Sequence, residues 1–226
     1  MKNFKGYIET DQFKIGCTGQ TVYIYDKDGN EVKKFKDLIY AYAPAVSPLG
    51  DLLVVKSTEG RLAVYSLKTL SLIKKFRFSK VNYAQDDGFC FSPDGKYFIN
   101  IERHVDDLHS AISVYDTRDF SLVSRHMLPE DESVDCIECS DSEYYVLGHF
   151  RLEYDVEYDV EYFVANFKDF SVADKVKITS REYDFLHLQL MSNRGYPLTE
   201  NENSKYLDLF KNAKYVRLVD LWKTRK

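Results

Sequence analysis

The most charged segment of the sequence alternates acidic residues with aromatic or apolar ones. Residues 130–161 contain twelve Asp and Glu residues but a single base, Arg151, which gives a net charge of −11. The whole chain carries −5, so charge is strongly segregated. From residue 153 to residue 161, every odd position is acidic and every even position is Tyr or Val. In a β-strand this period of two places all five carboxylates on one face.

Such a face suits the electrostatic capture of a basic surface on another protein. The candidate binding residues are Glu153, Tyr154, Asp155, Glu157, Tyr158, Asp159 and Glu161. The carboxylates would attract a cationic partner from beyond contact distance, and the tyrosines would add apolar contact area. Two alternatives stay open, namely a solvated hairpin face and a divalent-cation site. Neighbouring carboxylates on a straight strand do not converge as calcium ligands do, which weakens the cation alternative.

A second acidic loop precedes this segment. Asp106 and Asp107 lie between His104 and His109, and both aspartates belong to the candidate binding residues. His104, Asp106 and His109 also have the side-chain types of a transition-metal site. Polar loops are usually solvated without being metal ligands, so we expect no metal there.

The cysteines suggest a second metal or redox candidate. Cys136 and Cys139 form a C-x-x-C motif, which occurs in zinc and redox sites. Both fall in a predicted strand, where residues three apart point to opposite faces. Together with Cys17 and Cys90 we expect four free thiols that behave as small hydrophobic residues. No nucleophile elbow or Gly-rich phosphate loop is present, and we predict a non-enzyme without metal or cofactor.

These residues must be positioned by a repeated unit of four short strands. The clearest copy is residues 89–128, in which four apolar runs are separated by polar turns. Tyr65 and Tyr115 close equivalent alternating runs 50 residues apart. The turn SPDG at 92–95 corresponds to SPLG at 47–50. Self-similarity at this period, with four strands per unit, is typical of a β-propeller.

The unit resembles a blade of the WD40-like and YVTN-like β-propellers. The FSPDG turn at residues 91–95 is similar to the commonest turn of that family. Three dipeptides stand where the family has Trp-Asp, namely Tyr25-Asp26, Tyr115-Asp116 and Val219-Asp220. No Gly-His pair opens a blade, and the one tryptophan, Trp222, precedes Lys. The resemblance therefore implies the architecture, without the family's hydrogen-bonded tetrad.

We predict an all-β fold, a β-propeller of about five blades with four antiparallel strands each. Residues 1–226 form one domain in this prediction, with blades at about 1–36, 41–78, 83–128, 133–179 and 183–222. The last blade has strands at 185–191, 206–210 and 215–221 and is three-stranded, unless Phe4–Glu9 supplies its outer strand. The spacing from Phe4 to Phe13 fits a hairpin within the first blade better. A helix over 204–224 is a competing interpretation.

The composition limits the expected cellular location of the protein and the classes of partner that it binds. A chain of 226 residues suits one all-β domain, and no run of 18 apolar residues predicts a membrane span. Residues 1–5 lack the apolar core of a signal peptide, which favours a cytoplasmic protein. Lysines such as Lys33, Lys74 and Lys175 gather in the fourth strands, where they protect blade edges or bind nucleic acid. The acidic net charge favours edge protection, so we expect no nucleic-acid partner.

The function predicted from these features is a non-catalytic protein-interaction or scaffold module. An acidic propeller rim would bind a partner protein with a basic surface. One alternative is a five-bladed carbohydrate-binding or glycoside-cleaving propeller, which needs carboxylates converging from first strands, and Glu9 and Asp135 are the plausible ones. Another alternative is a subunit that completes its propeller with another chain, since the last blade is incomplete. The sequence does not predict the oligomeric state.

Overall fold

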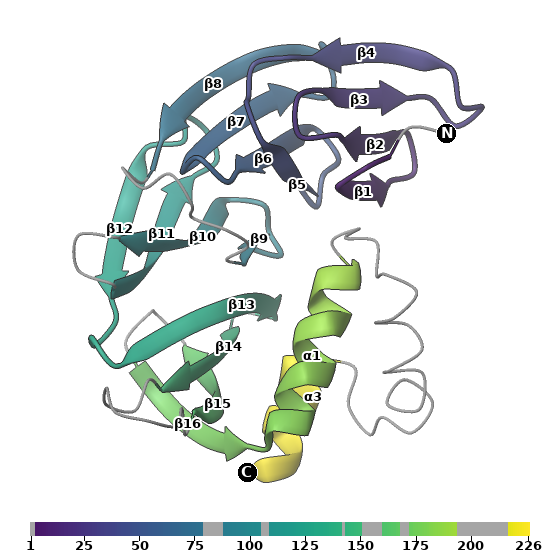
Figure 1. The fold of residues 1–226 in the computed structure, drawn as a ribbon. Coiled ribbons are helices and arrows are strands. Elements are labelled where there is room, and N and C mark those ends of the chain that lie inside the picture. Colours follow the sequence, from purple (N-terminus) through teal and green to yellow (C-terminus); the bar gives the residue numbers. More distant parts are fainter. Residues whose placement is uncertain are drawn as a thin grey trace. The chain divides into compact units, whose positions relative to one another are not determined.

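The computed structural model describes residues 3–78, 88–104, 109–141, 143–150, 160–167, 172–193 and 217–226 (Figure 1). The chain divides into two compact units. The first consists mainly of Met1–Asp86, and the second mainly of Asp87–Met191 with the C-terminal residues. A single domain over all 226 residues stays a prediction.

The first unit contains two four-stranded antiparallel sheets. The first sheet has β1 (Gly6–Glu9), β2 (Lys14–Cys17), β3 (Val22–Tyr25) and β4 (Glu31–Phe35). The second has β5 (Ala41–Val46), β6 (Leu52–Ser57), β7 (Arg61–Ser66) and β8 (Ser71–Arg77). Strands pair in chain order within each sheet. Because β1 pairs with β2, Phe4–Glu9 belongs to the first blade, as its spacing predicted.

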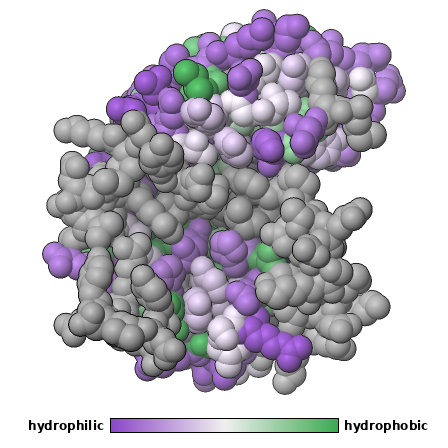
Figure 2. Space-filling model, viewed as in Figure 1, coloured by the Kyte–Doolittle hydropathy of each residue, from purple (hydrophilic) through white to green (hydrophobic). Residues whose placement is uncertain are grey.

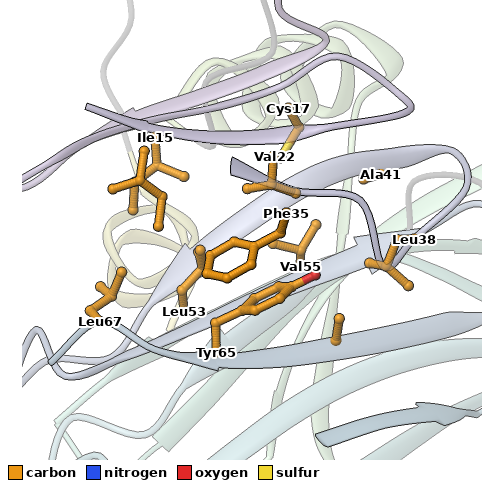
Figure 3. Packing of buried hydrophobic residues seen from close by; sticks show 12 residues of the cluster. Ile15, Cys17, Val22, Phe35, Leu38, Ala41, Leu53, Val55, Tyr65 and Leu67 are labelled. Atoms are coloured by element: carbon orange, nitrogen blue, oxygen red, sulfur yellow. The ribbon is translucent and has the colours of Figure 1, made fainter. Parts of the chain in front are cut away.

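An apolar core joins these two sheets (Figure 3). Alternate residues of β2 and β3, such as Ile15 and Val22, pack with alternate residues of β6 and β7, such as Leu53 and Tyr65. This follows from the strand geometry, since successive side chains point to opposite faces. The Phe35 ring stacks on the Tyr65 ring with centroids 4.1 Å apart. The two sheets of the first unit therefore share one hydrophobic interior.

The second unit repeats the same sheet order and adds two helices. Its first sheet has β9 (Phe89–Phe91), β10 (Tyr97–His104), β11 (His109–Asp116) and β12 (Leu122–Met127). Its second has β13 (Glu132–Ser140), β14 (Glu143–Phe150), β15 (Glu161–Phe167) and β16 (Val172–Ile178). Ile101, Val114, Phe163 and Ala165 are among the buried residues that join these two sheets. Four predicted four-stranded blades are thus confirmed as antiparallel sheets.

Two predicted turns have the same structure. Ser47 Oγ accepts a hydrogen bond from the Leu52 backbone at 3.0 Å, and Ser92 Oγ accepts one from the Tyr97 backbone at 2.9 Å. The glycine three residues after each serine has a φ of 73° or 71°, a left-handed conformation that glycine adopts without steric cost. The SPxG pattern is therefore a real repeated turn.

The repeat extends to strained backbone positions. Leu70 and Phe120 lie fifty residues apart and have φ values of 50° and 53°. Left-handed backbone is uncommon for residues other than glycine. Both residues stand just before the fourth strand of their sheets, so the same local geometry recurs at equivalent positions of the unit.

The strands predicted at 185–191 and 215–221 are wrong. The first lies within the helix α1 (Ser180–Asn193), and the helix α3 (Leu218–Arg225) begins inside the second. The strand predicted at 206–210 lies outside the described residues, so a fifth blade is not confirmed. The competing helix over 204–224 agrees with the part of that range that the structure describes.

A capping box explains why α1 is a helix. Thr179 Oγ1 accepts a hydrogen bond from the Glu182 backbone at 3.2 Å, and Glu182 Oε2 accepts one from the Thr179 backbone at 2.8 Å. This reciprocal pair satisfies two backbone N–H groups that a helix start leaves free. Leu186 and Leu190, which suggested an alternating strand, are four residues apart and are both buried on one helix face.

The two helices cover one face of the fourth sheet (Figure 1). Leu186 of α1 and Leu221 of α3 pack in the same buried cluster as Cys136, Leu147 and Val164 of the sheet. This is the face on which another blade would otherwise pack. The helices therefore replace a fifth sheet as the apolar cover of β13–β16.

Polar contacts fix the ends of α3. Glu138 on β13 accepts hydrogen bonds from the Leu218 backbone at 2.9 Å and from Arg217 Nε at 2.7 Å. At the other end, Arg225 lies 2.6 Å from Glu182 of α1. A carboxylate on a strand thus serves as the N-terminal cap of a helix 80 residues later.

The described residues that are visible in Figure 2 are mostly polar. In Figure 2 the coloured residues are mainly hydrophilic, and hydrophobic colour is confined to small patches. Neither helix that the structure describes has the length and apolar character needed to cross a membrane.

Candidate functional site

The candidate site lies at one end of the fourth sheet, where the predicted acidic segment is anchored. Glu132, Phe150 and Glu161 are aligned across β13, β14 and β15, and Ile178 ends β16 beside them. We call this end the rim end. The chain between Phe150 and Glu161 leaves and re-enters the sheet here, so the fold ties the acidic segment to the rim end.

One candidate binding residue from the sequence is described by the structure. Glu161 begins β15, is exposed, and lies 2.6 Å from Lys177 on β16. The other eight lie outside the described residues: Asp106, Asp107, Glu153, Tyr154, Asp155, Glu157, Tyr158 and Asp159. Their role stays a prediction. The His104 and His109 backbones are paired at the end of β10 and β11.

A second ion pair at the rim end is buried. Lys175 on β16 pairs with Glu132 on β13. The Lys175 ammonium lies 5.3 Å from the Phe150 ring centre and 5.2 Å from that of Phe163. The aromatic rings and the carboxylate together hold this cation inside the sheet packing. Lys175 is therefore packed against the sheet, which differs from the exposed, edge-protecting position expected for the fourth-strand lysines.

A polar cluster links the rim end to α1. Asp135 Oδ2 accepts a hydrogen bond from the Tyr183 hydroxyl at 3.0 Å. His149 Nδ1 lies 2.9 Å from the same oxygen, where an Nδ1–H group donates to the carboxylate. Burial, followed by the Asp135 charge, raises the pKa of Tyr183, so this phenol stays protonated and continues to donate. Sequence reasoning did not connect these three residues.

Aromatic rings enclose the cluster. The Tyr162 and Tyr183 rings have centroids 4.2 Å apart, and His187 stacks on Tyr183 at 5.6 Å with an interplanar angle of 13°. The ring centroids of His149 and Tyr162 are 6.3 Å apart. The Asp-His pair has the orientation of a general-base dyad, but the residues described around it place no serine or cysteine nucleophile against His149. These contacts link β13, β14 and β15 to α1.

A pocket opens beside this cluster. Its volume is about 290 Å³, and its lining residues come from the start of β15, the end of β16 and the start of α1. They are Val160, Glu161, Tyr162, Lys177, Ile178 and Ser180. Tyr162 and Ile178 point toward the helices, whereas Glu161 and Lys177 lie on the opposite face of the sheet, which they share with Phe163.

A separate carboxylate is buried in the third sheet. Glu102 Oε1 accepts a hydrogen bond from the Tyr115 hydroxyl at 2.6 Å, and Arg125 lies 2.9 Å from Glu102 Oε2. Burial, followed by the Glu102 charge, raises the pKa of Tyr115. Tyr115 stands where the resembled family has tryptophan. Its hydroxyl joins a polar network across the neighbouring strands β10, β11 and β12.

The C-x-x-C pair is split between two environments. Cys136 is fully buried against the helices, whereas Cys139 is half-buried at the opposite face of β13. Burial raises the pKa of Cys139 to about 11, so its thiol is a poor nucleophile at neutral pH. None of the four cysteines forms a disulfide. In the described residues, no three His, Cys, Asp or Glu side chains are close enough together to hold a metal ion.

Comparison with known proteins identifies the fold but no family. No family model matches the sequence, and no curated protein matches it. A chain of Kuenenia stuttgartiensis hydrazine synthase matches 75% of this chain with 13% identity and a TM-score of 0.60. The Neurospora crassa Pan2 WD40 domain matches 77% with 12% identity and a TM-score of 0.53. The β-propeller domain of the Pyrococcus furiosus trilobed protease matches 77% with 15% identity and a TM-score of 0.51.

Each of these likenesses covers only part of the solved chain. The match covers 51%, 52% and 58% of the three solved chains, respectively, so this chain spans a little over half of their length. At such identities the likeness establishes the fold alone. The sixteen strands that the structure describes therefore have the blade organisation of a WD40-like β-propeller.

Proposed function

We propose that the chain is a non-catalytic protein-interaction module that binds the basic surface of a partner protein at the rim end of the fourth sheet. Propellers commonly offer their rims for binding, but the fold alone assigns no function. The proposal therefore depends on the charges at this site. The proposal includes a cytoplasmic location and a protein partner at the rim end rather than nucleic acid or a membrane.

The proposal rests on the observation that the lysines of β16 near the rim end are already paired with carboxylates. β16 presents two lysines at the rim end, and both already pair with carboxylates of the sheet, Lys175 with Glu132 and Lys177 with Glu161. The adjoining segment 151–159 contains four more acids and one base, Arg151. Its negative charge thus exceeds the counter-charge that β16 supplies. A basic partner would provide the balance and would be steered to the site.

The two alternative functions gain no specific support. Asp135, one of the acids proposed for glycoside cleavage, is buried and already accepts hydrogen bonds from His149 and Tyr183. Glu9, the other, belongs to the first unit and accepts a hydrogen bond from Tyr7. A further blade from another chain would need a free face on the fourth sheet, and α1 and α3 occupy that face.

The test compares two triple variants with equal loss of charge. Asp155→Ser, Glu157→Ser and Asp159→Ser remove acids of the rim segment, whereas Asp11→Ser, Asp28→Ser and Glu59→Ser remove acids of loops in the first unit. Partners captured from source cells are identified with wild-type protein, and their association rates are measured at several salt concentrations. We expect the rim variant to bind more slowly and with a weaker salt dependence. The proposal is wrong if both variants bind as the wild type does.

A further inference from the structure

We propose that the first unit binds a short segment of single-stranded nucleic acid on the face of its first sheet that is opposite the apolar core. Four aromatic side chains, Phe4, Tyr7, Tyr23 and Tyr25, define this surface, which we call the aromatic face. The inference goes beyond the protein partner proposed for the rim end of the fourth sheet. Each of the two proposals can fail while the other stands.

The strand register gathers the tyrosines on one face. Val22 and Ile24 of β3 point into the core that the first two sheets share, so Tyr23 and Tyr25 point to the opposite side. Tyr7 on β1 is aligned with Tyr23 through the β2 residue between them. All three tyrosines are half-buried, so part of each side chain remains accessible to a ligand.

A glycine gives the fourth ring its place. A Cβ atom at Gly16 would lie 2.4 Å from two ring atoms of Phe4, so Phe4 lies against β2 only because this position has no side chain. The Phe4 ring stacks on Tyr7 with centroids 5.6 Å apart, and Tyr23 stacks on Tyr25 with centroids 6.1 Å apart. Phe4 also meets the second pair edge-on. The rings thus form one connected surface.

Four lysines surround the rings. The strand register aligns Lys14 and Lys34 with the two tyrosines of β3, so both lysines lie on the aromatic face. Lys5 directly precedes β1 and Lys36 directly follows β4, which are the edge strands of this sheet. Cations therefore stand at both edges of the aromatic face and in its middle.

Two carboxylates share this face, and each has a donor. Glu9 accepts a hydrogen bond from the Tyr7 hydroxyl, and Glu31 lies 3.7 Å from Lys34. An exposed ion pair of this length is weak, so Lys34 can turn to a phosphate at small cost. Four lysines against two carboxylates leave the aromatic face positively charged.

The charge of the whole first unit also favours an anionic ligand. Residues 1–86 contain fourteen Lys and Arg but nine Asp and Glu, a net charge of +5, whereas residues 87–226 carry −10. The expectation of no nucleic-acid partner rests on the net charge of the complete chain, which hides this difference. It therefore applies to the second unit and not to the first.

Rings and lysines together fit single-stranded nucleic acid. Unpaired bases stack on aromatic side chains, and lysines between the rings pair with the phosphates that link those bases. In a duplex the bases stack on one another, so only the lysines would contribute. An acidic protein segment would likewise use the lysines but would not offer a π-face at every residue. The ligand class is therefore distinguished by its need for the rings.

The experiment measures binding of a fluorescein-labelled oligouridine of about twelve nucleotides by anisotropy. We expect a dissociation constant on the order of 10 μM at low salt. The duplex of this strand with oligoadenosine should bind about tenfold more weakly, because its bases cannot reach the rings. A glutamate peptide of equal charge should compete poorly.

Tyr25→Leu tests the rings, with Tyr97→Leu as its control. Tyr97 lies in the second unit and is 38% exposed, so the control removes a comparable ring away from the site. We expect Tyr25→Leu to weaken oligouridine binding about tenfold and Tyr97→Leu to leave it unchanged. Tyr25→Phe keeps the ring and should bind as the wild type does. Circular dichroism compares the folds of these variants.

Lys34→Gln tests the charge, with Lys68→Gln as its control. Both residues are exposed lysines of the first unit, but Lys68 lies in the turn between β7 and β8. Lys34→Gln should lower the slope of log affinity against log salt by about 0.7, the value for one phosphate contact on a single strand. Lys68→Gln should leave the slope unchanged.

Ultraviolet cross-linking keeps the test independent of how the variants fold. In wild-type protein, peptide mapping should locate the oligouridine cross-links at Phe4, Tyr23 or Tyr25. The proposal is overturned by cross-links confined to other residues, by equal affinity for the strand and the duplex, or by the absence of saturable binding. Equal competition by the glutamate peptide would assign the aromatic face to an acidic protein segment instead. None of these results bears on the rim end, which its own triple variant tests.

Discussion

The two faces of the fourth sheet are covered by different kinds of structure. Phe163 and Ala165 of β15 point toward the third sheet, whereas Tyr162 and Val164 point toward α1 and α3. Both faces bury apolar side chains to a similar degree. The first face is covered by a copy of the same unit and the second by helices that are no copy. Hydrophobic burial thus stabilises the sheet without requiring that its neighbour be another blade.

The largest effect is expected on the sheet-covered face. Phe163 is almost fully buried and also flanks the Lys175 ammonium. Phe163→Ala should lower the free energy of unfolding by about 3–5 kcal/mol, because it leaves a cavity between two sheets. Urea unfolding can be followed with the single tryptophan, Trp222, and with circular dichroism. Both signals should shift together, and a shift of the Trp222 signal alone would contradict joint packing.

A smaller and more local effect is expected on the helix-covered face. Leu221 is fully buried between α3 and the sheet. Leu221→Ala should cost about 2–4 kcal/mol. The Trp222 transition should move to lower urea than the strand signal, since α3 can separate first. Leu49→Ala at a 77% exposed position is the control. Identical shifts of both signals would mean that α3 unfolds together with the sheets rather than before them.

The anchor of α3 on β13 tests the helix cover without changing its apolar surface. Glu138→Ala removes the acceptor for the Leu218 backbone and should cost about 1–2 kcal/mol. Arg217→Ala should cost less than about 0.5 kcal/mol, because the Arg217 side chain is half-exposed and its ion pair is screened. If Arg217→Ala proves as costly as Glu138→Ala, the ion pair rather than the cap holds the helix.

The capping box of α1 allows a matched pair of adjacent substitutions. Thr179→Ala removes the hydroxyl that accepts from the Glu182 backbone and should cost about 1 kcal/mol. Ser180→Ala changes a neighbouring exposed hydroxyl and should be nearly neutral. Thermal unfolding monitored by Trp222 fluorescence can compare them. Equal costs would show that α1 depends on its apolar face alone.

Lowering the pH should weaken the contact between α1 and α3. This is the smallest of the predicted effects on stability. Burial alone would raise the pKa of Glu182, but hydrogen bonds from Thr179 and Arg225 outweigh it and lower that pKa. A lowered pKa means that the stabilisation is present above the ordinary Glu pKa and is lost as pH falls through the folded value. In the Glu182→Gln variant, the melting temperature should therefore fall less steeply as the pH is lowered than it does in the wild type. In the control variant Asp184→Asn, on the same helix, it should fall more steeply than in Glu182→Gln.

The sheets could be predicted because their signals are local and repeated. The SPxG turns at 47–50 and 92–95 recur with the same serine hydrogen bonds and the same glycine conformation. Alternating apolar residues then define strands between these turns. Each copy of the unit supports the interpretation of the others, so several weak motifs together predict the fold.

The helices were missed because leucines at 186, 188 and 190 fit a strand as well as part of a helix. The decisive signal was Thr179-x-x-Glu182, a capping box directly before that apolar run. For α3, Glu138 acts as a cap from 80 residues away, and no local pattern contains that information. Likewise, Asp135, His149 and Tyr183 meet only through strand register and helix docking. Contacts set by tertiary packing cannot be found from spacing alone.

The helix cover of the fourth sheet also bears on how this chain can grow by duplication. A blade that packs only on other blades can be followed by a further copy, because its free face accepts the same partner again. α1 and α3 present helix surfaces instead, so a copy added after β16 would have to displace them. Duplication of a unit before β13 would leave the contacts of α1 and α3 with the fourth sheet unchanged. The two helices therefore occupy the face on which a further blade would pack. We expect related chains to gain or lose blades before β13 in the sequence.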